Sequence, residues 1–216
     1  MSLGTANVTL AGGSVGGSSL GGVVHTADAL SYQITNTDDA VYERPAPTSA
    51  NWGGSVNPGD DVRNCVVSTD NPTNRNPGLR FAGITVPQGS IIGTATLEVY
   101  VRSATCSFVT NVFGDAVDNS PNFLTPNNDV DGRPRTSASL AVNDASLTQY
   151  TWKAMNVAGI LQELVSRGGW VSGNAATFLL IPPASGANSD CSFADVGTDA
   201  PHAAKLTVAY LPPFIL

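Results

Sequence analysis

The sequence has few charged side chains. Only 12% of its 216 residues are Asp, Glu, Lys or Arg, about half the usual fraction in a soluble domain. Its 10 basic residues are outnumbered by 17 acidic ones, which gives a formal net charge of −7. Because nucleic-acid binding and adhesion to anionic membranes both depend on Lys and Arg, we expect neither partner. A polar but weakly charged surface favours broad contacts with other proteins.

Long apolar runs are also missing. No stretch approaches the ~20 apolar residues of a membrane span. The first residues, Met1 to Asn7, lack both the basic region and the apolar segment of a secretory signal. We therefore expect either a protein that stays in the cytoplasm where it is made or a mature form.

Cysteine is scarce and odd in number. Cys65, Cys106 and Cys191 match no zinc-binding spacing. The tripeptide Cys-Ser-Phe begins at both Cys106 and Cys191, in two expected strands. Two alternatives stay open: small buried core residues, or a disulfide between the two or to a neighbouring subunit.

Short strands separated by Gly, Pro and Asn dominate what is present. In residues 95–102, Ala95, Leu97, Val99 and Val101 alternate with polar residues or Tyr, which indicates a strand with one buried face. Residues 176–181 form a short run that is apolar except for Thr177, and predict a central strand buried on both faces. Further strands are expected at 32–35, 40–43, 65–67, 79–84, 108–113, 136–140, 148–152, 192–196 and 205–210. This pattern predicts an all-β fold, a two-sheet antiparallel jelly-roll sandwich.

One helix interrupts the strands. Residues 157–167 carry an apolar stripe at helical spacing, preceded by Asn156 as the N-cap and followed by Gly168. We expect this helix to cap an open end of the sandwich, with Trp152 and Trp170 on either side.

Three regions follow from composition. Residues 1–28 form a Gly-rich arm that buries too little apolar surface to order alone. Residues 29–210 form the sandwich, and residues 211–216 form an apolar tail. We expect function to lie in the arm, the tail and the long loops at 44–78 and 114–135.

Several motifs carry a family resemblance. Gly78-Leu-Arg-Phe81 and the following Ile84-Thr-Val-Pro-Gln-Gly-Ser-Ile-Ile-Gly-Thr-Ala-Thr-Leu97 resemble a stretch of DNRLRE-like domains. Arg167-Gly-Gly-Trp170 and the closing Lys205-Leu-Thr-Val-Ala-Tyr210 resemble the later half of that family. The resemblance implies a jelly roll similar to carbohydrate-binding modules of bacterial surface and secreted proteins. It also implies an early acidic pair, which Asp38 and Asp39 match.

Two binding sites are considered. Calcium takes 6–8 oxygen ligands, and Asp38, Asp39 and Glu43 are the candidates, with Asp129-Val130-Asp131-Gly132 as a second cluster. Solvated acidic turns are the alternative for both. A glycan would need exposed aromatic rings, for which Trp52, Tyr100 and Tyr150 are the candidates.

Catalytic motifs are not found in the sequence, and the two histidines, His25 and His202, lie far apart along it. We therefore expect a non-enzymatic structural protein of a virus particle, a capsid-decoration or tail or neck component of a tailed bacteriophage. Its partners would be other virion subunits, including copies of itself. The alternative is a carbohydrate-binding module of a secreted or surface protein, with structural calcium. A polysaccharide hydrolase or lyase ranks third.

Overall fold

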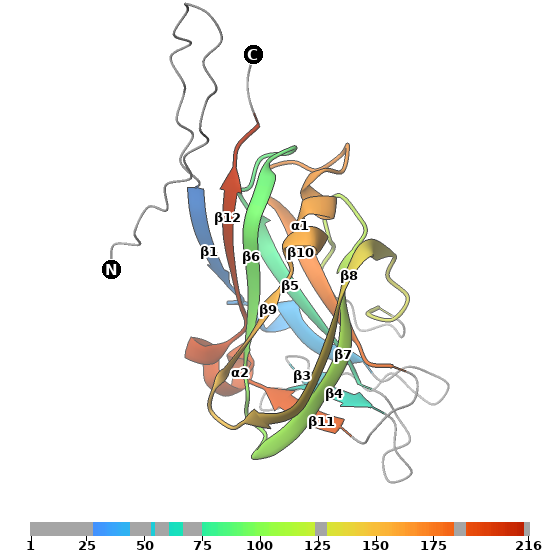
Figure 1. The fold of residues 1–216 in the computed structure, drawn as a ribbon, viewed down its shortest axis with the longest axis vertical. Coiled ribbons are helices and arrows are strands. Elements are labelled where there is room, and N and C mark those ends of the chain that lie inside the picture. The colour runs from blue at the N-terminus through green and yellow to red at the C-terminus, as the bar shows by residue number, and fades with distance from the viewer. Residues whose placement is uncertain are drawn as a thin grey trace, which may run out of the picture.

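Two antiparallel sheets pack face to face in the computed structural model, which describes residues 28–43, 53–54, 61–66, 75–123, 129–183 and 189–213 (Figure 1). Residues 1–27 of the predicted arm, Trp52 and residues 214–216 of the tail lie outside these residues, whereas Asp28 begins the first strand. Across the first sheet the order is β1 (Asp28–Gln33), β12 (Lys205–Leu211), β6 (Ile91–Tyr100) and β9 (Trp152–Asn156).

The second sheet has six strands. Their order is β3 (Gly53–Gly54), β2 (Ala40–Glu43), β5 (Asn76–Ile84), β10 (Asn174–Ile181), β7 (Thr105–Asp115) and β8 (Arg135–Thr148). A small third sheet pairs β11 (Ser189–Phe193) with β4 (Val62–Val66).

The strand order is that of a jelly roll. Leaving aside β2, β3, β4 and β11, the chain passes from one sheet to the other at every step except the β7–β8 hairpin. The two four-stranded layers β1-β12-β6-β9 and β5-β10-β7-β8 result. The predicted antiparallel β-sandwich is therefore confirmed.

The described residues contain two short α-helices where the sequence predicted one. Helix α1 (Ala158–Val165) lies at one end of the sandwich, within the predicted range, and Asn156 Oδ1 accepts the N–H of Ala158 at 3.1 Å. The missed helix is α2 (Val196–Asp199), which is followed by the 3-10 turn η2 (Ala200–His202). A further 3-10 turn among the described residues is η1 (Thr37–Asp39).

Two local predictions are wrong. The strand expected at 148–152 is the end of β8 and a turn, because Tyr150 adopts a φ of 61° there and reverses the chain. Trp152 then begins β9 on the outside of the sandwich, away from α1. Trp170 is where it was expected, 1% exposed and donating its Nε1–H to the carbonyl of Val86 at 3.0 Å.

The core lies between the two sheets. Strand β6 contributes Ala95, Leu97 and Val99 from alternate positions, as its sequence predicts. From the opposite sheet come Phe81 and Phe178, whose ring centroids lie 6.0 Å apart in an edge-to-face contact. Helix α1 adds its own buried stripe, which consists of Ile160, Leu161, Leu164 and Val165.

The outer face of the six-stranded sheet is covered as well, which explains why β10 is apolar on both faces. Leu179 and Ile181 point away from the main core and pack against Phe123 and Val130 from the 116–133 region. That region was expected to be a functional loop, but its described residues act as a structural cover.

Arg133 holds this cover in place. Its side chain is buried and donates to Asp115 at 2.9 Å and to Asp129 at 3.0 Å. It also donates to Ser120 Oγ at 2.9 Å and lies 4.3 Å from the centroid of the Phe123 ring. One guanidinium thus joins the end of β7, the covering segment and the 129–133 turn.

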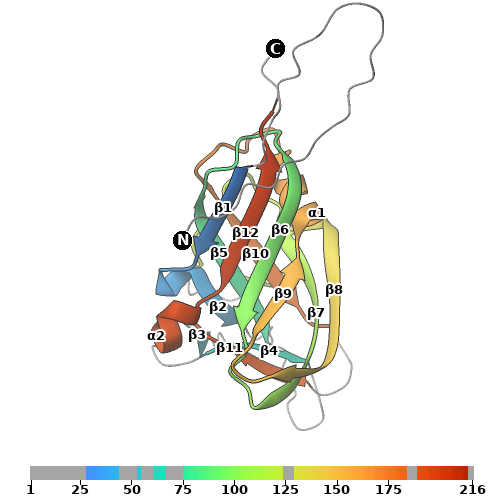
Figure 2. The ribbon, with the colours of Figure 1, turned by 60° about the vertical axis from the view of Figure 1, so that its left-hand side comes forward.

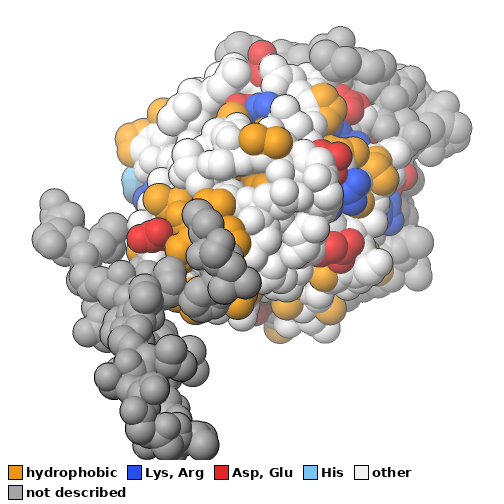
Figure 3. Space-filling view, turned by 90° about the horizontal axis from the view of Figure 1, so that it is seen from above, with side chains coloured by type: hydrophobic (Ala, Val, Ile, Leu, Met, Phe, Trp, Pro, Cys, Tyr) orange, Lys and Arg blue, Asp and Glu red, His pale blue; other side chains and the backbone are white. Residues whose placement is uncertain are grey.

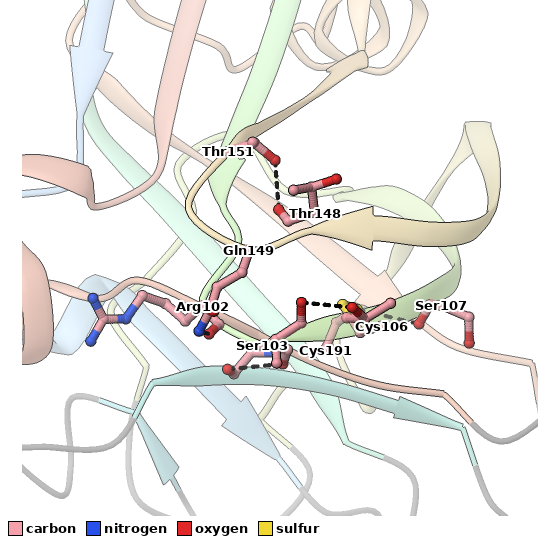
Figure 4. The surroundings of a disulfide bond; sticks show 11 residues. Arg102, Ser103, Cys106, Ser107, Thr148, Gln149, Thr151 and Cys191 are labelled. Atoms are coloured by element: carbon pink, nitrogen blue, oxygen red, sulfur yellow. Dashed lines mark hydrogen bonds between the residues drawn. A yellow bond between two sulfur atoms is a disulfide. The ribbon is translucent and has the colours of Figure 1, made fainter.

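A disulfide joins Cys106 of β7 to Cys191 of β11, with 5.4 Å between the Cα atoms (Figure 4). Both residues are buried, and Phe108 and Phe193 pack edge to face beside the bond at 5.1 Å. Of the two alternatives for the repeated Cys-Ser-Phe tripeptide, the structure has the intramolecular bond. It ties the small sheet to the sandwich across 85 residues of chain.

Removing the disulfide should destabilise the protein. The double substitution Cys106→Ala and Cys191→Ala should lower the free energy of unfolding by about 2–5 kcal/mol, because the unfolded chain loses a long-range constraint. Urea unfolding of the oxidised protein and the variant measures this. A change under about 0.5 kcal/mol would mean that β11 is anchored by its other contacts alone.

Candidate functional site

The outer face of the four-stranded sheet consists mostly of small or uncharged side chains. We call this surface the sheet face, and its members are Ala29, Ser31, Gln33, Thr94, Thr96, Glu98, Ala154, Asn156, Lys205, Thr207 and Ala209. Each is exposed or half-buried, and the residues between them on the same strands point into the core. Glu98 and Lys205, its two charged residues, lie opposite each other in register.

An aromatic corner borders one end of the sheet face. Tyr100 and Trp152 are cross-strand partners on β6 and β9, with ring centroids 5.2 Å apart. His202 stacks on Tyr100 at 4.0 Å, and Lys205 Nζ lies 4.1 Å from the centroid of the Trp152 ring. All four side chains are half-buried, so these rings cover one another.

Turn η2 places His202 at this corner, where Asp199 contacts both His202 and Arg102. Asp199 Oδ1 lies 2.9 Å from His202 Nδ1, and its other oxygen lies 3.3 Å from Arg102. A carboxylate that orients a histidine is one part of a general-base arrangement. Among the described residues, however, the His202 ring contacts Asp199, Tyr100 and Trp152, so its neighbours are one carboxylate and two aromatic rings.

Asp195 stabilises helix α2, which leads directly into turn η2. It caps α2 by accepting the N–H of Val196 at 2.6 Å, while the residue is only 1% exposed. Burial raises the pKa of this carboxyl to about 6, against the hydrogen bonds from the Val196 and Gly197 N–H groups, and nearby Asp61 raises it further.

Two of the three calcium candidates, Asp39 and Glu43, are engaged by other groups of the protein. Asp39 is buried and pairs with Arg80 at 2.7 Å, whereas Asp38 is exposed. Glu43 is buried and accepts the N–H groups of Val130 and Asp131 at 2.8 and 2.9 Å. Among the described residues, no group of three His, Cys, Asp or Glu side chains is placed to hold a metal ion.

The second acidic cluster meets the first through Glu43, a contact that sequence reasoning missed. Asp129 pairs with Arg133 at 3.0 Å and Asp131 with Arg135 at 2.7 Å. Arginine is thus the cation that neutralises these carboxylates, and Glu43 anchors the turn that carries them.

The glycan candidates are not brought together as one platform. Trp52 lies outside the described residues, and Tyr100 is stacked against His202. Tyr150 is 59% exposed at the β8–β9 turn, with the Arg102 guanidinium 6.0 Å from its ring centroid. The members missed in the sequence, Trp152 and His202, needed the strand register and η2 to place them beside Tyr100.

Apolar side chains gather at the opposite end of the four-stranded sheet. Figure 3 looks onto this end and shows an apolar patch on a surface that is otherwise mostly uncharged. Ile91, which is 56% exposed, pairs there with half-buried Leu211, and Pro213 of the predicted tail is exposed.

No protein-family model and no curated protein matches the chain. The resemblance to DNRLRE-like domains therefore stays a prediction from the motifs. Several motif residues have structural roles: Arg80 pairs with Asp39, and a Cβ at Gly78 would overlap the ring of Phe123. Among the helices of the described residues, none is long and apolar enough to span a membrane.

The raised pKa of Asp195 predicts a pH-dependent stability. Between pH 3.8 and about 6 the folded state holds a proton that the unfolded state has released. The contribution of Asp195 to the free energy of unfolding therefore falls as pH rises through this window, by roughly 2–3 kcal/mol.

The variant Asp195→Asn keeps an N-cap but does not titrate. Urea unfolding of both proteins at pH 4 and pH 7 should show the wild type losing stability relative to the variant as pH rises. A parallel pH dependence of the two proteins would contradict the buried, protonated carboxyl.

Proposed function

We propose that the protein is a non-enzymatic structural subunit of a virus particle, a capsid-decoration or tail component that packs against neighbouring copies of itself. The observation that carries this proposal is the sheet face. It spans all four strands, and Thr, Ser, Ala and Asn with one mutually opposed charge pair make up most of it.

Such a face suits association between copies for two physical reasons. Small side chains lose little conformational entropy when they are covered. A surface that presents Glu98 beside Lys205 is also self-complementary about a two-fold axis, since each charge meets the opposite one on the other copy.

Two further features support the proposal. Disulfides persist in oxidising surroundings, which include virion surfaces, and Cys106–Cys191 suits a protein that functions outside the reducing cytoplasm. At the level of the fold, jelly rolls are frequent in viral shells.

Charge repulsion across the sheet face should prevent association. The double substitution Thr96→Arg and Thr207→Arg places two cations at the centre of the face, where Thr207 and Thr96 are cross-strand partners. We expect the wild-type chain to form a homo-oligomer and this variant to remain monomeric. Size-exclusion chromatography with light scattering measures the molar mass.

Thr148→Arg is the matched control, because Thr148 is exposed at the end of β8, outside the sheet face. It should leave the oligomer unchanged. A wild-type chain that stays monomeric at every concentration tested, or a double variant with the wild-type molar mass, would overturn the proposal.

Glycan binding is the second candidate, favoured by one observation. Tyr150 is exposed with Arg102 beside it, which provides a ring face and a hydrogen-bond donor at one turn. Retention of a monomeric wild-type chain on a glycan column, lost in Tyr150→Ala, would support this alternative against the virion subunit.

A further inference from the structure

The edges of the two sheets approach each other along β8 and β9. Each strand is the last of its sheet, and Figure 2 shows them side by side beneath α1. A groove of about 250 Å³ lies between them, lined by residues 140–144 and 153–156. Its apolar lining residues include Leu140, Val142 and Met155, which also belong to or pack against the main core.

Side-chain contacts flank this groove at both ends of the exposed part of β8. At one end Glu163 of α1 accepts the N–H groups of Ser137 and Ala138 at 2.9 and 2.7 Å. At the other end Asp144 of β8 and Lys153 of β9 form an ion pair at 2.7 Å. Between them, residues 139–143 of β8 have no paired strand on their outer side among the described residues.

The direction in which the backbone N–H and C=O groups of β8 point follows from its pairing with β7. The N–H of Gly114 donates to Thr136 Oγ1 of β8 at 2.8 Å, so even-numbered residues of β7 face β8. Their partners Leu140 and Val142 direct their backbone groups toward β7. The N–H and C=O groups of Ser139, Ala141 and Asn143 consequently point outward, as on an open sheet edge.

The chemistry of the groove defines its ligand. An extended segment would pair with Ser139, Ala141 and Asn143 through its backbone and place alternate small apolar side chains over Leu140, Val142 and Met155. Residues 139–143 carry no charge, so a charged strand would find no counter-ion there.

The chain itself contains such a segment. Residues 1–27 have no Asp, Glu, Lys or Arg, and within them Ala6, Val8 and Leu10 alternate with Asn7 and Thr9. This is the period-2 pattern of a strand with one buried face, and Gly12-Gly13 follows it directly.

We propose that residues 6–10 of a neighbouring copy add as a strand to β8 in this groove. The inference rests on the proposed function and names the contact by which subunits would be linked. The donor is assigned to a neighbouring copy because the proposed function requires links between copies; the arm enters the fold at β1, at the opposite edge of the four-stranded sheet from β9. Ala154 and Asn156 belong to both the groove and the sheet face, so the two contacts are continuous.

The area of the sheet face also calls for a second contact. Four strands at ~4.8 Å spacing and about seven residues of length give roughly 450 Å². A stable interface buries about 800 Å² on each partner. A donated strand supplies additional buried area together with backbone hydrogen bonds.

Complementation between two full-length variants tests the proposal. Ala141→Pro removes the outward N–H of the acceptor edge but leaves the arm intact. Val8→Asp with Leu10→Asp replaces two apolar side chains that the donated strand would bury, but leaves the groove intact. Each variant alone should show a dissociation constant raised by about ten-fold or more in sedimentation analysis, whereas their mixture should form a two-chain complex.

Two matched controls separate this effect from general damage. Ala141→Ser keeps the N–H at the same position, and Asn7→Asp with Thr9→Asp adds the same charges on the polar face of the arm. Both should associate as the wild type does. Thermal unfolding should give Ala141→Pro a melting temperature close to that of Ala141→Ser.

The outcomes distinguish the two proposals. If Ala141→Pro and the Val8/Leu10 variant associate like the wild type while Thr96→Arg with Thr207→Arg does not, strand donation is wrong and the structural-subunit proposal stands. If both variants lose association but their mixture gains none, donation between copies is overturned. A monomeric wild-type chain overturns both proposals.

Discussion

An open sandwich must leave sheet edges, and each edge carries backbone groups that lack a partner strand. This constraint governs much of the architecture. Among the described residues, α1 closes one end of the sandwich, and its Glu163 accepts two N–H groups of β8 that would otherwise be unpaired. The Asp144–Lys153 ion pair joins β8 to β9 further along. What remains open is the middle of β8, beside the groove that Leu140, Val142 and Met155 line together with polar residues.

The outer face of the six-stranded sheet must also be covered by other parts of the chain. Because β10 is apolar on both faces, its outer face needs a cover, and the 116–133 region supplies Phe123 and Val130. A buried arginine then holds that cover by pairing with Asp115 and Asp129. Three of the acidic residues that suggested a calcium site, Asp39, Asp129 and Asp131, are thus paired with arginine.

Local patterns in the sequence predicted most of the fold. The alternation through β6, the apolar run of β10 and the stripe of α1 each depend on neighbouring residues, so they could be read directly. The missed features depend on contacts between distant segments. Asp39 meets Arg80 and Glu43 meets the 130–131 turn only after β2 pairs with β5. Trp152 was misplaced because the reversal at Tyr150 occurs in a residue type that seldom adopts positive φ.

The candidate site was predicted less completely. Tyr100 was identified as an aromatic candidate, but its partner His202 comes from η2, which follows a helix of only four residues with no periodic signal. The sheet face could not be recognised either, because its members come from four strands that are far apart along the chain. Only the strand order places Ser31, Thr207, Thr96 and Asn156 in one row.

Amide hydrogen exchange of the full-length chain, above and below the concentration at which it associates, tests the central claim most directly. If copies are linked by a strand added to β8, the amides of Ser139, Ala141 and Asn143 should exchange slowly in the oligomer and rapidly in the monomer. Association with no change in the exchange of these three amides would contradict the account.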